Sequence, residues 1–258
     1  MAFQLAVCAE MVFTDMPFIE RVERIHAKGL CVEMWDWSNK DLVQLAATGA
    51  TFTSMTGYLR GTLTTAHGIE ELLSTAKLSI EASRHFGNLN LNLHGTGLGE
   101  GGLPVEPVDE VTEAMWHSAR ETLQQIAELG EQEGVNFVLE NLNLDVDHPG
   151  VPFARAHDTL ALVSYVNNPH LKMNLDLYHA QIGEGNLISL IEQSLPWIGE
   201  IQIADVPGRC EPGTGEINYA GVARALASFG YTGVVGMEAF ASGNSDVAIE
   251  RFVDAFTV

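Results

Sequence analysis

Short apolar runs alternate with longer amphipathic segments along this chain, and that alternation constrains the fold most. The apolar runs have the length of buried strands, and the segments between them have helical spacing. The predicted strands are Leu5–Ala9, Leu30–Met34, Thr51–Met55, Leu89–Leu93, Asn136–Glu140, Leu171–Asp176, Glu200–Ala204 and Val234–Glu238. The predicted helices lie near Pro17–Lys28, Lys40–Thr48, Ile69–Phe86, Val108–Gly134, His157–Val166, Leu187–Leu195, Tyr219–Phe229 and Asp246–Phe256. Eight strands, each followed by a helix, predict a (β/α)₈ TIM barrel of the α/β class.

Glycines mark the ends of several predicted helices, where a left-handed cap is common. They are Gly29, Gly49, Gly87, Gly134 and Gly230. The length of 258 residues suits one barrel, and neither a linker nor a low-complexity tract divides the chain, so residues 1–258 are expected to form a single domain. The hydrophobic content of 46% against 18% charged residues is enough for a large buried core.

Each of the last four predicted strands carries an oxygen-bearing side chain at or near its carboxyl end. These side chains are Glu140, Asp176, Gln202 and Glu238. Because the carboxyl ends of barrel strands meet at one mouth, we expect the four to converge on a divalent metal ion. A shell of oxygen donors favours Mg²⁺ or Mn²⁺ over Zn²⁺, with Co²⁺ as a further candidate. The alternative for any one carboxylate is a helix N-cap or a loop salt bridge, although Gln and Glu are weak capping residues.

His179 and Arg209 follow two of these strand ends closely. A histidine beside a metal ion can relay protons or bond to a substrate oxygen. The alternatives are a helix-start histidine bonded to backbone and an arginine in a surface ion pair with Glu211.

Other side chains near the predicted mouth are weaker candidates. His94 could reach the mouth, Glu33 could line the pocket or support the arginine, and Asn143 follows Glu140. Trp35 could wall the site, although aromatic residues at a barrel rim are often packing residues.

The charge and the cysteines limit the partners. The formal net charge is −21, from 34 acidic and 13 basic side chains, so a polyanion such as nucleic acid would be repelled. The three cysteines are widely spaced and do not form a disulfide framework. The chain has no run of about 20 apolar residues and no basic leader, so we expect a cytoplasmic protein without a membrane span.

Several segments resemble the bacterial hydroxypyruvate isomerases, within the xylose isomerase-like TIM barrel superfamily. The segment IQIADVPGRCEPGTGEINY, Ile201–Tyr219, is the most specific, and Met11–Arg21, Leu139–Asn143 and Leu175–Gln181 also match. The resemblance covers nearly the whole chain.

The resemblance implies roles for particular residues. The metal ligands would be Glu140, Asp176, Gln202 and Glu238, and the two glutamates would also transfer protons. The resemblance further implies that His179 and Arg209 contact substrate oxygens, and that the enzyme forms a homo-oligomer, as relatives often do.

The chain also departs from that family, at positions that border the substrate. The last strand is followed by Ala239-Phe240-Ala241 in place of the usual Tyr-Lys-Pro, and Asn141 replaces a proline. We therefore expect the chemistry to be kept while the substrate stays open.

The expected activity is isomerisation of hydroxypyruvate or a similar small keto or aldehyde sugar or sugar acid. The proton would move through a metal-bound enediolate. A 3-epimerase or a β-eliminating lyase acting on a keto sugar would use the same site. A metal-binding sugar sensor is the non-catalytic alternative.

Overall fold

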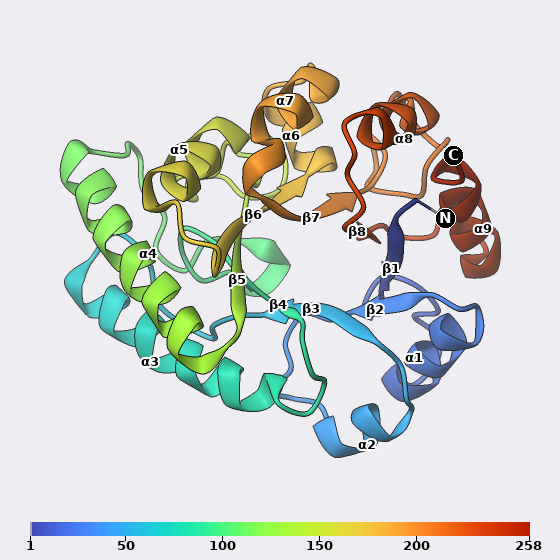
Figure 1. Cartoon of the computed structure of the whole chain (residues 1–258), viewed down its shortest axis with the longest axis horizontal. Helices are drawn as coiled ribbons and strands as arrows, with labels where there is room; N and C mark the ends of the chain where they lie inside the picture. Colours follow the sequence, from blue (N-terminus) through green and yellow to red (C-terminus); the bar gives the residue numbers. More distant parts are fainter. Residues whose placement is uncertain (1) are drawn as a thin grey trace.

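The strands close into a barrel. The computed structural model describes residues 2–258, in which eight parallel strands are hydrogen-bonded in chain order and β8 pairs with β1. Figure 1 shows the strands as an inner ring with the helices outside it. The strands are β1 Gln4–Cys8, β2 Cys31–Glu33, β3 Phe52–Thr56, β4 Asn90–Leu93, β5 Asn136–Glu140, β6 Leu171–Asp176, β7 Ile198–Ile203 and β8 Val234–Met237. The predicted (β/α)₈ fold is confirmed.

The helices cover the outside of the barrel (Figure 1). They are α1 Phe18–Ala27, α2 Leu42–Ala47, α3 Ala66–Ser83, α4 Glu113–Glu133, α5 Ala156–Val166, α6 Leu177–Gly183, α7 Leu187–Ser194, α8 Tyr219–Ser228 and α9 Ser245–Ala255, with 3₁₀ turns η1 Glu100–Gly102 and η2 Leu195–Trp197. The long helix α4 buries Leu123 and Ile126, and Gly134 ends it in the left-handed conformation, as predicted.

The helices differ from the prediction most clearly at α4 and α6. The helix expected from Val108 begins at Glu113, because the Thr112 side chain caps it and the Val108 N–H donates to the carbonyl of Gly150. The short helix α6 was not predicted. It starts directly after β6, where Asp176 Oδ1 accepts the N–H of His179.

The apolar core and the polar interior occupy opposite faces of the strands. Successive strand residues point to opposite sides, so the buried side chains Met173 and Leu175 alternate with Asn174 and Asp176 along β6. Asn174 Nδ2 donates to Gln202 of β7, at 2.6 Å from its Oε1, which shows that this polar face lines the barrel interior. The interior therefore holds polar side chains.

The two ends of the described chain lie together (Figure 1). The rings of Phe3 and Phe256 meet edge-on, with centroids 6.0 Å apart. No helix within residues 2–258 has the length and apolar content that a bilayer crossing needs.

Candidate functional site

Three carboxylates and one histidine cluster at the carboxyl ends of the strands. Glu140 ends β5, Asp176 ends β6, Glu238 directly follows β8, and His179 lies in the first turn of α6. One potential ligand atom from each lies within 4.8 Å of all the others, and all four side chains are buried. The structure therefore brings together three of the four predicted metal ligands and the predicted substrate-binding histidine.

The side chain of Gln202 lies close to this cluster, but its hydrogen bonds go to residues inside the barrel. It pairs with Asp176 across β6 and β7. Its Oε1 accepts from Asn174, and its Nε2 donates to Glu33 Oε2 at 3.3 Å. Glu33 therefore supports Gln202 rather than Arg209, and the amide oxygen lies on the polar face that also carries the carboxylates. Ligation of a metal ion by Gln202 stays a prediction.

The donor set fits a hard divalent cation. Asp176 caps α6 through Oδ1, as the capping alternative anticipated, yet its buried Oδ2 has no hydrogen-bond partner. Burial, followed by the charge of Glu140, raises the pKa of Asp176 well above its usual range. A buried carboxylate oxygen without a partner is costly, and a cation bound by oxygen ligands would satisfy it.

The two glutamates of the cluster have different partners. Glu140 Oε2 accepts a hydrogen bond from Asn92 Nδ2 and lies 3.0 Å from His94 Nε2. Burial alone would raise the pKa of Glu140, but the bonds from His94 and Asn92 lower it overall. Glu238 accepts from Trp35 Nε1 at 2.6 Å and from Arg209. Burial raises the pKa of Glu238, and the Arg209 charge opposes that rise.

Arg209 reaches the cluster from the loop after β7. Its guanidinium bonds to Glu238 and lies 5.2 Å from the centre of the Tyr178 ring. The residue has a φ of 53°, and its carbonyl accepts the N–H of Phe240. The alternative of an ion pair with Glu211 is wrong, because Glu211 pairs with Arg251 at 2.8 Å.

His179 faces the same cluster from the other side. Its ring is fully buried, with Nε2 at 3.4 Å from Arg209 Nη2 and 3.9 Å from Glu140 Oε1. Burial, and then the charge of Arg209, lowers the pKa of His179 well below its usual range. His179 does lie at a helix start, where its own N–H donates to the Asp176 side chain, but its ring contacts the side chains of Asn143 and Arg209 rather than backbone.

Several polar residues around the site were not predicted from the sequence. They are Asn92, Asn174, Asp147 and His148. The pattern Asn90-Leu91-Asn92-Leu93 is the signal that could have found the first, because regular alternation places both asparagines on one face of β4. The contacts of Asp147 and His148 depend on the path of the loop after β5, which has no comparable periodicity.

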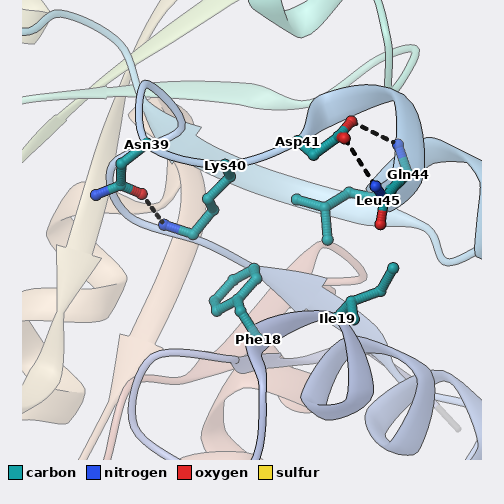
Figure 2. A pocket seen from close by; sticks show the side chains of 7 residues that line it. All are labelled: Phe18, Ile19, Asn39, Lys40, Asp41, Gln44 and Leu45. Carbon is teal, nitrogen blue, oxygen red and sulfur yellow. Dashed lines mark hydrogen bonds between the residues drawn. The ribbon is translucent and has the colours of Figure 1, made fainter.

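A surface pocket between α1 and α2 lies apart from this cluster (Figure 2). It is lined by Phe18, Ile19, Asn39, Lys40, Asp41, Gln44 and Leu45. Its charged groups already have structural partners. Asp41 caps α2 through the Gln44 N–H, as Figure 2 shows, and Lys40 pairs with Glu10 at 2.9 Å. The pocket thus follows from the packing of the two helices.

Comparisons with known proteins agree with the barrel fold. Residues 16–255 match the family described as xylose isomerase-like TIM barrel. The 2-oxo-tetronate isomerase of Pectobacterium atrosepticum is 35% identical over 134 residues, which are 52% of this chain and 51% of that protein. The hydroxypyruvate isomerase of Escherichia coli is 32% identical over 169 residues, 66% of this chain and 62% of that protein. The matches thus span about half, or somewhat more, of these relatives' own length.

Solved structures share the whole fold. An AP endonuclease of family 2 from Brucella melitensis has a TM-score of 0.86 at 26% identity, covering 97% of this chain and 98% of that one. The 3-keto-D-glucoside 4-epimerase of Escherichia coli has a TM-score of 0.78 at 18% identity, covering 99% and 100%. The second likeness, at this identity, shows the fold alone.

Proposed function

Because the chain belongs to the xylose isomerase-like TIM barrel family, we propose that it is a divalent-metal-dependent isomerase of a small hydroxy-keto acid or keto sugar. One observation carries the proposal: Glu140, Asp176, Glu238 and His179 gather at the mouth with a buried carboxylate oxygen that lacks a partner. The relatives named hydroxypyruvate isomerase and 2-oxo-tetronate isomerase support an acid as substrate. The Arg209 guanidinium suits the carboxylate end of such a molecule.

The metal site would use the four predicted ligands. Glu140, Asp176, Gln202 and Glu238 would hold Mg²⁺ or Mn²⁺, or alternatively Co²⁺. When bound, the ion would supply Lewis-acid polarisation of the substrate's neighbouring carbonyl and hydroxyl oxygens. The oxygen atoms of Gln202 and Asp176 lie on strands that pair directly, which supports a shared ligand set.

The protein groups would then move one proton between adjacent carbon atoms. One of Glu140 and Glu238 takes the proton from the hydroxyl-bearing carbon and the other serves the neighbouring carbon, while the hydroxyl proton passes to the oxygen of the former carbonyl. His179 hydrogen-bonds to the oxygen on which negative charge develops, and Arg209 anchors the far end of the substrate. The surrounding barrel wall excludes bulk water from the buried carboxylates.

Two other outcomes use the same groups. A 3-epimerase would return the proton to the opposite face of the carbon, and a lyase would expel a β-substituent. The isomerase is preferred because the curated relatives that match by sequence carry isomerase names. We further propose that the barrel acts as one domain in the cytoplasm, where its three free cysteines stay reduced, and that it forms a homo-oligomer.

Turnover of hydroxypyruvate and 2-oxo-tetronate by the Mg²⁺-loaded protein tests the proposal. Glu140→Gln and Glu238→Gln keep the side-chain shape but remove the base. Each should lower kcat by at least about 10²-fold, the usual contribution of a positioned acid or base, with an unchanged circular dichroism spectrum. The exposed Glu250→Gln is the matched control and should keep full activity. Activity within about tenfold of the parent in either site variant contradicts the paired roles.

A further inference from the structure

Asn143 makes a direct contact with His179 that fixes which ring nitrogen can carry a proton. Asn143 lies in the loop after β5 and is buried, and its Nδ2 stands 2.7 Å from His179 Nδ1. An amide nitrogen is only a donor, so the ring nitrogen that it faces must accept. This conclusion depends on which way the amide of Asn143 points.

The neighbours of Asn143 settle the orientation of that amide. Its Oδ1 accepts two backbone N–H groups, from Val146 and Asp147, each at 3.0 Å. Its Nδ2 also donates to Asp147 Oδ2 at 2.6 Å. The reversed amide would set its NH₂ against two N–H donors and its oxygen against a carboxylate, so these three favourable contacts would become repulsive.

The carboxylate of Asp147 is itself held in place. Tyr178 donates its hydroxyl proton to the same Oδ2 at 2.9 Å. A tyrosine hydroxyl keeps its proton at neutral pH, so it can only donate to this carboxylate oxygen. Asp147 Oδ2 therefore accepts from both Tyr178 and Asn143, and the second N–H of the Asn143 amide is left to donate to His179.

The opposite ring nitrogen faces the catalytic cluster. With Nδ1 accepting, the neutral imidazole carries its proton on Nε2, which lies 3.9 Å from Glu140 Oε1. The contact of Arg209 Nη2 with Nε2 is longer, at 3.4 Å, and a hydrogen bond there would need an unprotonated Nε2, which the shorter Asn143 contact excludes. A protonated Nε2 has no lone pair left to bind a cation or to accept a proton.

We propose that Asn143 is a positioning residue that holds His179 in the Nε2–H tautomer, so that His179 is a fixed hydrogen-bond donor to a substrate oxygen and neither a metal ligand nor a base. The role toward substrate rests on the proposed function, whereas the tautomer stands on the hydrogen bonds alone.

The test is ¹⁵N NMR of the full chain labelled at histidine, with His179→Gln used to assign the signal. We expect a pyridine-like Nδ1 and a pyrrole-like Nε2 for His179, both without metal and with Mg²⁺. His148 is an internal control with the opposite tautomer, because its Nδ1 lies 2.6 Å from the carbonyl oxygen of Gly102. A pyrrole-like Nδ1 in His179, or loss of its Nε2 proton when Mg²⁺ is added, overturns the inference.

The variant Asn143→Asp tests whether the tautomer of His179 affects catalysis. The carboxylate would accept at this position, so the His179 proton should move to Nδ1 and kcat should fall by about tenfold or more, with a smaller change in KM. An altered tautomer with unchanged kcat overturns the donor role of His179. The tautomer is measured without substrate, so it can be tested independently of the isomerase proposal. If only the isomerase proposal is wrong, the parent protein will be inactive but will still give the expected ¹⁵N spectrum.

Discussion

Glu200 is a buried acid inside the barrel, outside the proposed metal shell. Asn90 Nδ2 donates to its Oε2 at 2.8 Å, while its Oε1 has no partner. Burial raises the pKa of Glu200 to about 8, and the charge of Glu140 adds to this rise. Because an unfolded glutamate has a pKa near 4.3, the folded state holds this proton more tightly.

The sign of the effect on stability follows from that difference. Below a pH of about 4.3, Glu200 is protonated in both the folded and the unfolded state, so its burial as a charge does not lower the free energy of unfolding. As the pH rises, the unfolded chain ionises first, so the free energy of unfolding falls until the pH passes the folded pKa of about 8.

Glu200→Gln should therefore raise the Tm of the metal-free protein at pH 8. The amide resembles the neutral acid and can still accept from Asn90. We expect a gain of about 2 kcal/mol, or roughly 4–8 °C, at pH 8 and a much smaller gain near pH 5. Thermal unfolding followed by circular dichroism measures both values, and equal gains at the two pH values would contradict the assignment.

The loop after β7 owes its shape to one carboxylate. The buried Asp205 accepts four backbone N–H groups, from Val206 and Ile217 on Oδ1 and from Gly213 and Gly215 on Oδ2. Gly215 is required at its position, because a Cβ atom there would lie 2.1 Å from the Val206 carbonyl oxygen.

The loop after β7 is also hydrogen-bonded to the loop after β8. Glu211 accepts from the N–H and the hydroxyl of Ser242, which lies in the loop after β8, each at 2.8 Å. Arg209 and Glu238, which form the ion pair in the site, come from these two loops. The two carboxylates Asp205 and Glu211 therefore set the distance between the guanidinium and the proposed base.

Asp205→Asn should weaken both the loop and substrate binding. The amide nitrogen would face two backbone donors, and two hydrogen bonds to a charged acceptor would be lost, at a cost of about 2–4 kcal/mol. We expect a lower Tm and a raised KM, whereas Arg209→Lys should raise KM with little change in Tm. The two variants compared by thermal unfolding and steady-state kinetics test this, and a Tm for Asp205→Asn equal to that of the parent would refute it.

Elements of this fold differ in how well the sequence predicts them. The strand β6 is evident from its apolar run, and α4 from its helical period and its final glycine. The helix α6 is only seven residues long and begins directly after the last residue of β6, so the segment is too short for helical periodicity to be detected. Its start depends on the Asp176 cap, a local bond that the sequence allows but does not require.

At the scale of the whole molecule, too, one part of the site could be predicted from the sequence and another part could not. Barrel topology brings strand ends together, so the meeting of Glu140, Asp176 and Glu238 could be predicted from their places in the chain. The bond of Asn143 to His179 could not, since it depends on how the loop after β5 returns over the mouth. Loop paths are set by tertiary contacts rather than by periodicity.

Metal removal should lower the stability of the whole barrel. The buried carboxylates repel one another, and an ion that binds only the folded state adds about 2.7 kcal/mol at a concentration of 100 times its Kd. Chelation should therefore lower the Tm, and excess Mg²⁺ or Mn²⁺ should restore it. The variant Asp176→Asn should lose most of this metal-dependent increase in Tm. A Tm that is the same with and without divalent ions in the parent protein would contradict the metal site.

The most direct test of proton transfer is ¹H NMR in D₂O of the Mg²⁺-loaded protein with hydroxypyruvate and with 2-oxo-tetronate. The account predicts signals of a new isomer that carries deuterium on the carbon that receives the proton, and none of this with Glu140→Gln or Glu238→Gln. Substrates that neither isomerise nor exchange a carbon-bound proton with solvent, in the presence of bound metal, would contradict it.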